Sequence, residues 1–277
     1  MGHQRFPKSI PEFSKSYALL SDDPSVDTTV VFVHGFGGRP TSTWLDFHGL
    51  VKMCSGKYPW WQKSDLFFYS YESLKTPILA NAERLGLFLN HILSKDENGA
   101  LRFSASQSAS KRQMVLVGHS EGAVVIRRML LDRFNTLKQT PQLKAAKLKA
   151  ALKADIVLNS RLRLFAPACM GTNFSSLLGF ATSFSTLIAA VASSSLVRNE
   201  LLKDSPVLTQ IREETDKART KFPNVPSFTA NVLFGVPDQV VYTVSYSWDD
   251  TKTLKGHDHF SICKPQFSYL RPLEFVS

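Results

Sequence analysis

The chain has 277 residues, of which 43% are hydrophobic, and its formal net charge is +10 at pH 7. This length and apolar content suffice for a large core, and we expect a single domain over residues 1–277. Three cysteines without framework spacing exclude a disulfide-stapled scaffold and fit a reducing compartment. The first residues lack the apolar core of a secretion signal, so we expect a cytoplasmic location.

The first buried strand is expected at residues 28–33, Thr-Thr-Val-Val-Phe-Val, and runs straight into His34-Gly-Phe-Gly-Gly. The 27 residues before it are too few and too polar to supply leading strands, which predicts a sheet of about six strands. Three glycines allow a tight loop, and residues 41–44 are typical of a helix start. The glycines lack both the Gly-x-Gly-x-x-Gly order and the Lys-Ser/Thr pair of phosphate-binding loops.

Strands and helices then alternate along the chain. We expect a strand at residues 65–71, a helix over 77–93, a strand over 114–118 with a helix behind it, and a strand over 162–167. This alternation is typical of a mostly parallel sheet with helices on both faces. Ligands of such sheets bind at the carboxyl ends of the strands.

Residues 114–122, Met-Val-Leu-Val-Gly-His-Ser-Glu-Gly, carry a strand into the pattern Gly-x-Ser-x-Gly. This pattern is the sharp strand-to-helix turn that presents a serine oxygen for nucleophilic attack, which makes Ser120 the candidate nucleophile. Gly118 and Gly122 flank the serine because a Cβ at either position would crowd it. So short a pattern also occurs by chance, and its interpretation therefore depends on the segments that accompany it.

A serine that attacks a carbonyl group needs N–H donors where negative charge develops on the oxygen. The residue after the serine and a glycine-rich loop supply them, and here these are Glu121 and Phe36, with Gly37 as an alternative to Phe36. The Glu121 carboxylate would also lie near the site and disfavour anionic acyl groups. His34 is expected to support the loop by a hydrogen bond, and His119 to pack beside the serine.

An acid and then a base must follow the serine if the chain order is Ser, Asp, His. Asp238 comes on a turn just after the strand-like stretch at 228–234 and is the favoured acid. Asp249 and Asp250 are the alternatives, although they belong to a polar segment rather than to the end of an apolar strand.

His259 is the favoured base, and His257 is its alternative. The base would take the proton from the serine, while the acid fixes the imidazole tautomer and stabilises the imidazolium. The two histidines with Asp258 between them can also be interpreted as a metal cluster. The other histidines are scattered and no second ligand pair has zinc spacing, so we expect neither a metal nor another cofactor.

Together these motifs resemble the α/β-hydrolases of a lipase-like branch that includes GPI inositol-deacylase and the serine-active-site-containing proteins. The resemblance covers roughly residues 28–265 and rests on three segments: His34-Gly-Phe-Gly-Gly with Thr43-Trp44, Gly118-His-Ser-Glu-Gly with Val125-Ile-Arg127, and Asp258-His-Phe-Ser-Ile-Cys-Lys264. It implies an α/β-hydrolase fold and a serine hydrolase whose triad is Ser120, Asp238 and His259. Such proteins often carry Leu or Met after the serine, where this chain has Glu121.

No charged residue occurs between Gly171 and Val197. The segment is long enough for a membrane span, but it is rich in Ser and Thr and lies between motifs that must meet in one domain. We expect instead a helical cap at residues 172–215 that forms the acyl pocket, with an ordinary buried helix as the alternative. The candidate pocket residues are Leu177, Leu178, Phe180, Phe184, Leu187 and Ile188.

Five lysines with leucines between them indicate an amphipathic basic segment, which either faces solvent or contacts an anionic membrane surface peripherally. These lysines are Lys138, Lys144, Lys147, Lys149 and Lys153. No aromatic-rich basic motif accompanies them, so we do not expect nucleic acid as a partner.

The sequence therefore predicts a cofactor-independent carboxylesterase or lipase that acts on a lipid or other small-molecule ester through an acyl-enzyme. Cleavage of thioesters or amides by the same triad is one alternative. A non-catalytic member of the fold that binds lipid or protein is another, but a binding protein has no need for a nucleophile, acid, base and oxyanion loop together.

Overall fold

The computed structural model describes residue 3 and residues 8–45, 47–54, 56–95, 97, 101–104, 112–140, 145–173 and 196–277. In this part of the chain, eight strands form one sheet in the order β1-β2-β4-β3-β5-β6-β7-β8. The strands are β1 (Lys8–Ile10), β2 (Phe13–Leu19), β3 (Thr28–Val33), β4 (Ser64–Tyr69), β5 (Gln113–His119), β6 (Arg161–Phe165), β7 (Ala230–Val236) and β8 (Asp250–Lys255).

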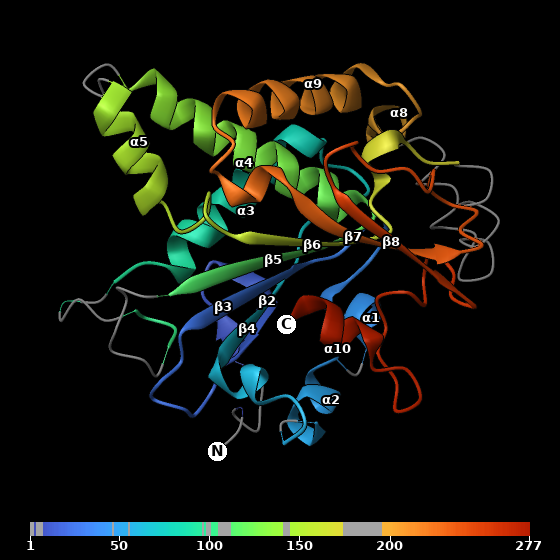
Figure 1. Cartoon of the computed structure of the whole chain (residues 1–277). Coiled ribbons are helices and arrows are strands. Elements are labelled where there is room, and N and C mark those ends of the chain that lie inside the picture. Colours follow the sequence, from blue (N-terminus) through green and yellow to red (C-terminus); the bar gives the residue numbers. More distant parts are fainter. Residues whose placement is uncertain are drawn as a thin grey trace.

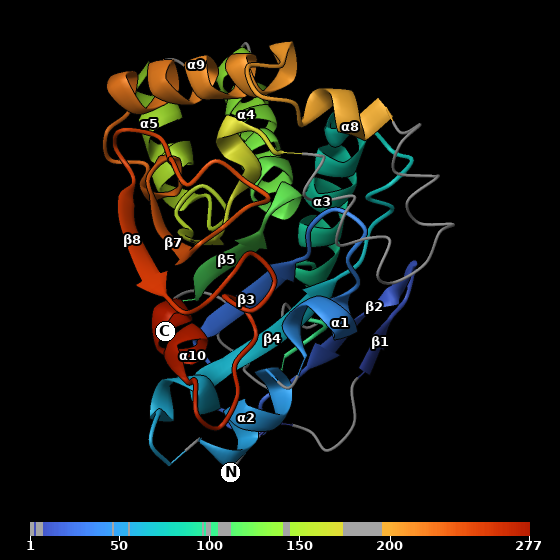
Figure 2. The same cartoon turned by 90° about the vertical axis from the view of Figure 1, so that its right-hand side faces the viewer.

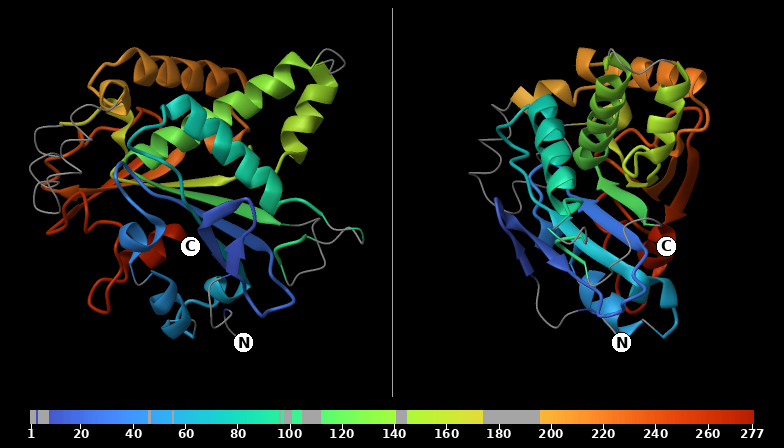
Figure 3. Two further views of the ribbon diagram at one scale, coloured as in Figure 1. Left: turned by 180° about the vertical axis from the view of Figure 1, so that it is seen from behind. Right: turned by 90° about the vertical axis from the view of Figure 1, so that its left-hand side faces the viewer.

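Helices cover both faces of this sheet, as the alternating pattern predicts (Figure 1). On one face lie α3 (Ile78–Ile92), α4 (Glu121–Gln139), α5 (Ala145–Ala154) and α9 (Pro206–Lys221). The other face carries α1 (Pro40–Trp44), α2 (Phe47–Met53) and α10 (Arg271–Val276), and both views in Figure 3 show the same division. The short helix α8 (Leu196–Glu200) lies beside one end of α9, as Figure 2 shows.

From β4 to β8 all neighbouring strands are parallel, and only β1 and β2 run antiparallel to their neighbours. This is the α/β-hydrolase fold. Strands β3 and β4 are buried along their whole length and β5 from its second residue on, because helices cover them on both sides. The carboxyl ends of β5 and β7 therefore meet at one edge of the sheet, which is where the candidate catalytic residues begin.

The expected number of about six strands is wrong, since the sheet has eight. The strands that the sequence did not reveal include the hairpin of β1 and β2, where Ile10, Ala18 and Leu19 are buried and most other side chains are partly or fully exposed. Tyr17 stacks on Phe68 of β4 with ring centroids 4.7 Å apart. A hairpin at the edge of a sheet buries too few side chains to require a run of apolar residues, so its sequence has the polar composition of a loop.

Strand β8 at the opposite edge of the sheet was not predicted from the sequence for the same reason. Five of its six residues are exposed, from Asp250 to Lys255. Its backbone pairs in parallel with β7, with Asn231 opposite Asp250. Polar side chains on an edge strand prevent it from pairing with other chains. The same polar side chains remove the apolar pattern by which a strand is predicted from sequence.

Three lysines of the basic segment lie on α5, which is amphipathic as expected: Lys147, Lys149 and Lys153 are exposed and Leu152 is buried. Lys138 lies in the last turn of α4, and Lys144 lies outside the described residues. Helix α4 starts directly after Ser120 and its 19 residues span about 28 Å. Helix α5 follows α4, and Figure 1 shows it at the end of the molecule away from the start of α4. The exposed lysines therefore lie far from the candidate nucleophile.

The six candidate pocket residues, from Leu177 to Ile188, lie outside the described residues, and so does most of the expected cap. Helices α8 and α9 occupy its second half, and α9 packs against α4. The extent of a cap over residues 172–215 stays a prediction. Among the described helices, none combines the length and apolar character needed to cross a bilayer.

A buried ion pair joins α4 to the segment before β8. Arg127 Nη2 donates to Asp249 Oδ2 at 2.6 Å, and both side chains are 1% exposed. The guanidinium also lies 4.3 Å from the ring centroid of Tyr246, and Asp249 Oδ1 accepts from the Ala230 amide at 2.9 Å. Asp249 therefore ties the helix behind the candidate nucleophile to β7.

We expect removal of either partner to destabilise the fold by about 3–5 kcal/mol, because the remaining charge stays buried without a counter-ion. Urea unfolding of Arg127→Met and of Asp249→Asn measures this loss. The double variant Arg127→Met/Asp249→Leu should lose much less than the sum of the single losses. Asp250→Asn removes the exposed neighbouring carboxylate and should change stability by no more than about 0.5 kcal/mol; equal losses at the two aspartates would contradict this account.

Candidate active site

Ser120 stands between β5 and α4 with φ 53° and ψ −122°, a conformation that L-residues rarely adopt. Neighbouring backbone holds it there: the Ser120 amide donates to the Phe165 carbonyl at 3.1 Å, and the Ser120 carbonyl accepts from the Ala123 and Ala168 amides. The turn therefore projects the serine side chain out of the strand at the carboxyl edge of the sheet.

Two glycines allow the backbone to approach this turn closely. A Cβ on Gly122 would lie 2.4 Å from the carbonyl oxygens of Val33 and His34, and one on Gly35 would lie 2.7 Å from the Ser120 Cβ. Both distances are below any real Cβ contact. Gly122 of the strand-to-helix turn at Ser120 (the elbow) and Gly35 of the glycine loop therefore allow the backbones of these two segments to approach each other closely.

The structure brings Ser120, Asp238 and His259 together, although His259 is 139 residues from Ser120 and 21 residues from Asp238 along the chain. His259 Nδ1 lies 3.1 Å from Asp238 Oδ2, and His259 Nε2 lies 3.1 Å from Ser120 Oγ. Because a carboxylate only accepts, Nδ1 carries the proton and donates it. Nε2 then has a free lone pair to accept the serine hydroxyl.

Asp238 is held by the turn that follows β7. Its Oδ1 accepts from the amides of Val240 and Val241 at 2.9 and 3.1 Å, which leaves Oδ2 for His259. The side chains of Asp238 and His259 are 0% and 2% exposed. Burial strengthens their electrostatic interaction because little water screens it.

The alternatives for the acid and the base have other partners. Asp249 belongs to the buried ion pair with Arg127, and Asp250 lies exposed on β8, where it pairs with Lys252 at 3.6 Å. The ring of His257 stacks on Tyr269 with centroids 3.7 Å apart. The structure brings none of these three alternatives to Ser120.

Asp258 organises the turn that carries His259. Its Oδ1 accepts from the amides of Phe260 and Ser261 at 3.0 and 2.8 Å and from the Ser261 hydroxyl at 2.7 Å. Burial alone would raise the pKa of Asp258, but these hydrogen bonds outweigh it and hold the pKa below its usual value. The side chains of His257, Asp258 and His259 contact separate partners and do not converge on one point.

His119 has a larger role than the packing expected for it. Its Nε2 donates to the backbone carbonyl of His259 at 2.8 Å, and the two rings lie 4.8 Å apart. Burial, together with the neighbouring His259, lowers the pKa of His119 well below its usual value, so the ring stays neutral. The residue before the serine thus fixes the backbone of the candidate base.

His34 supports the glycine loop, as expected from the sequence. Its Nδ1 donates to the Gly35 carbonyl at 2.9 Å, and the Tyr71 hydroxyl donates to the His34 carbonyl at 2.8 Å. Burial lowers the pKa of His34 to about 4, so it is a neutral donor at neutral pH.

Gly37 donates its amide to Ser73 Oγ at 2.9 Å, so this amide already has an acceptor. Phe36 stays the predicted donor from the loop. The other candidate donor is the amide of Glu121, the first residue of α4. The first N–H groups of an α-helix have no acceptor within the helix. They also lie at its positive end, where an oxyanion is stabilised.

The Glu121 side chain differs from the expectation of a repelling carboxylate. It is fully buried, and neither carboxyl oxygen has a hydrogen-bond partner. Burial, followed by the charges of Glu200 and Glu72, raises its pKa well above the usual value. The carboxyl group is therefore neutral near pH 7 and presents no negative charge to an acyl group.

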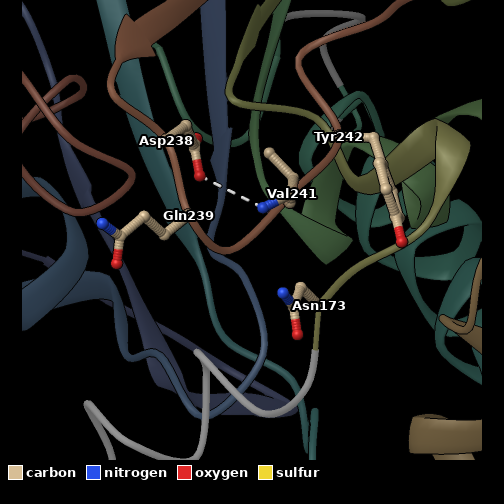
Figure 4. Close-up of a pocket in the computed structure, with 5 residues that line it drawn as sticks. All are labelled: Asn173, Asp238, Gln239, Val241 and Tyr242. Carbon is tan, nitrogen blue, oxygen red and sulfur yellow. Dashed lines mark hydrogen bonds between the residues drawn. The ribbon is translucent and has the colours of Figure 1, made fainter.

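Two small hollows lie beside the acid and the base. One of about 300 Å³ is lined by Asn173, Asp238, Gln239, Val241 and Tyr242, and Figure 4 shows the Asp238 carboxylate bonded to the Val241 amide there. The second, of about 190 Å³, is lined by Pro237, Gln239, Val240, Asp258, His259 and Phe260. His259 therefore borders open space.

No protein-family model and no curated protein sequence matches the chain. Among solved structures, phospholipase PlaB from Legionella pneumophila in complex with thio-NAD aligns with a TM-score of 0.50 and 16% identity, over 80% of this chain and 44% of that chain. This chain thus spans less than half of the phospholipase chain.

Two further structures match with TM-scores of 0.48 and 0.47: carboxylesterase CesB from Bacillus subtilis and MGS-MChE2, an α/β hydrolase enzyme from the metagenome of lagoon sediments of Mar Chica, Morocco. Identities are 13% and 11%, over 99% and 98% of this chain and 92% and 94% of theirs. At these identities similarity concerns the fold alone. The order and directions of the strands assign this chain the α/β-hydrolase fold.

Proposed function

We propose that the chain is a serine hydrolase that cleaves carboxylic esters through an acyl-enzyme intermediate. The observation that carries the proposal is the unbroken path of hydrogen bonds from Asp238 through His259 to Ser120, with both links at 3.1 Å. The strained backbone of Ser120 adds to it, because such strain clusters at functional sites.

In the proposed acylation, Ser120 Oγ attacks the carbonyl carbon of the ester while its proton passes to His259 Nε2. The imidazolium that forms is stabilised by the Asp238 carboxylate on Nδ1. The carbonyl oxygen gains negative charge, and the amides of Glu121 and Phe36 are the proposed donors to it. His259 then gives its proton to the departing alkoxide, which leaves as the alcohol.

In the deacylation, water attacks the acyl-serine carbonyl carbon and passes one proton to His259. The tetrahedral intermediate collapses, Ser120 recovers the proton from the imidazolium, and the carboxylic acid leaves. The hollow lined by His259 gives the proposed base a neighbouring open space, from which water can reach it.

The proposed substrate is a lipid or another small-molecule ester, without a charge preference set by Glu121. A lipid substrate agrees with the motif resemblance to the lipase-like branch of GPI inositol-deacylase, which we retain as part of this proposal. Thioesters and amides would be cleaved by the same residues, and the geometry of the site favours none of the three substrate classes.

Fluorophosphonate labelling tests whether Ser120 is a working nucleophile. We expect the wild-type chain to be labelled and Ser120→Ala to lose the label, because the reagent reacts with activated serines. The control Ser42→Ala changes an exposed serine and should leave labelling intact. A folded wild-type chain without label would favour the non-catalytic binding protein.

The acid assignment predicts different costs at two aspartates. Asp238→Asn should lower kcat on a p-nitrophenyl ester by about 10⁴-fold, because the imidazole loses the partner that fixes its tautomer. Asp250→Asn should leave kcat within about twofold, since its carboxylate is exposed and paired with Lys252. A larger loss for Asp250→Asn than for Asp238→Asn would refute the assignment.

The neutral Glu121 predicts a distinct pH dependence of stability. Above about pH 4.5 the unfolded chain releases the glutamate proton while the folded chain keeps it, so the wild type loses stability as pH rises. Glu121→Gln cannot titrate, and its free energy of unfolding relative to wild type should therefore increase from pH 5 to pH 8. Urea unfolding at both values measures this.

The matched control is Glu213→Gln, on an exposed turn of α9. Its difference from wild type should stay constant over the same pH range. A Glu121→Gln difference that also stays constant would mean that the buried carboxyl group titrates normally.

A further inference from the structure

Two arginines lie side by side on the face of the sheet that carries α10. Arg161 and Arg163 are two residues apart on β6, so both side chains point to the same face, with about 7 Å between their Cα atoms. Phe165, the next residue on that face, is covered by Phe275 of α10 at 4.8 Å. The two arginines are only half-buried.

Neither guanidinium has an acidic partner among the described residues. Nε and Nη2 of Arg161 and Nε of Arg163 are buried without a hydrogen-bond partner. The nearest carboxylates act only at longer range: Asp27 on Arg161, and Asp250 on Arg163. Asp250 is itself paired with Lys252. Arginine keeps its charge at any physiological pH, so this face holds two uncompensated cations.

The surroundings of the pair add donors and an aromatic wall. The guanidinium of Arg161 lies 5.7 Å from the ring centroid of Trp60. Asn231 pairs with Arg163 across β6 and β7 and is half-buried on the same face. Burial lowers the pKa of both arginines, and the charge of Arg161 lowers that of Arg163 further. An anion bound here would offset both the lost hydration and the mutual repulsion.

We infer that Arg161 and Arg163, with the Asn231 amide beside them, form a binding site for a phosphate group. One guanidinium fork satisfies a planar carboxylate, whereas a tetrahedral phosphate presents oxygens to two forks at once. The phosphate group belongs either to a small soluble ligand or to a lipid headgroup.

This site is separate from the proposed ester-cleaving centre. Arg163 lies opposite Val117 of β5, which is three residues before Ser120. On the same face of the sheet, the side chains of Phe165, Trp44 and Phe275 pack together between Arg163 and the carboxyl edge. The inference therefore does not depend on the proposed hydrolase activity, and each can fail alone.

Binding of inorganic phosphate tests the site directly. Thermal unfolding in sodium phosphate, compared with sodium chloride of equal ionic strength, should raise the Tm of both wild type and Ser120→Ala. Arg161→Gln/Arg163→Gln should weaken the apparent affinity about tenfold or more. The control Lys147→Gln/Lys149→Gln removes the same charge from the exposed face of α5 and should respond like wild type.

Vesicles distinguish the two sources of phosphate. If free phosphate has no effect but vesicles of phosphatidylcholine with phosphatidic acid bind the wild type and not the arginine variant, the ligand is a lipid headgroup. If neither probe binds, or if both bind the arginine variant as well as wild type, the inference is wrong.

Arginine modification keeps the test valid if the double variant does not fold. Phenylglyoxal should modify Arg161 and Arg163 of the wild-type chain more slowly in the presence of inorganic phosphate or phosphatidic acid vesicles, as measured by peptide mass spectrometry. Unchanged modification rates at both residues in both conditions would overturn the site.

Discussion

Ser120 occupies a backbone conformation that a chain adopts only when its surroundings impose it, and every other part of the candidate site depends on this. The parallel strands β3, β5 and β6 place backbone on both sides of the elbow, and Gly35 and Gly122 provide the room. Helix α4 starts at the next residue and directs its first amides toward the same point. The energetic cost of the strain is offset by the buried strands and helix that flank it.

Around that fixed point, the neighbouring side chains have different roles. Asp238 and His259 form the hydrogen-bonded path that leads to Ser120. His119 holds the backbone carbonyl of His259, and Asp258 holds the turn on which His259 lies. Burial keeps the flanking histidines neutral, so they act as hydrogen-bond donors and add no competing positive charge. The Arg127–Asp249 pair works one layer further out, where it fixes α4 against the strand that leads to the acid.

Sequence patterns could predict the parallel sheet, the strand-to-helix turn at Ser120 and which three side chains meet there, because each depends on local apolar runs and turn residues. The catalytic roles of these three side chains stay a prediction. They could not predict β1, β2 and β8, whose polar edges look like loops. The buried partner of Asp249 is 122 residues away, so only tertiary structure removes it as a rival to Asp238. The neutral state of Glu121 likewise follows from burial by distant segments, and sequence alone indicated a charged carboxylate.

The central claim is that Ser120 becomes acylated, and the most direct test is the mass of the protein shortly after mixing with a p-nitrophenyl ester. The account predicts an increase equal to one acyl group, mapped to the peptide that contains Ser120 and removed as the ester is consumed. Ester hydrolysis that continues at the same rate in Ser120→Ala, with no acyl group on that peptide in the wild type, would contradict it.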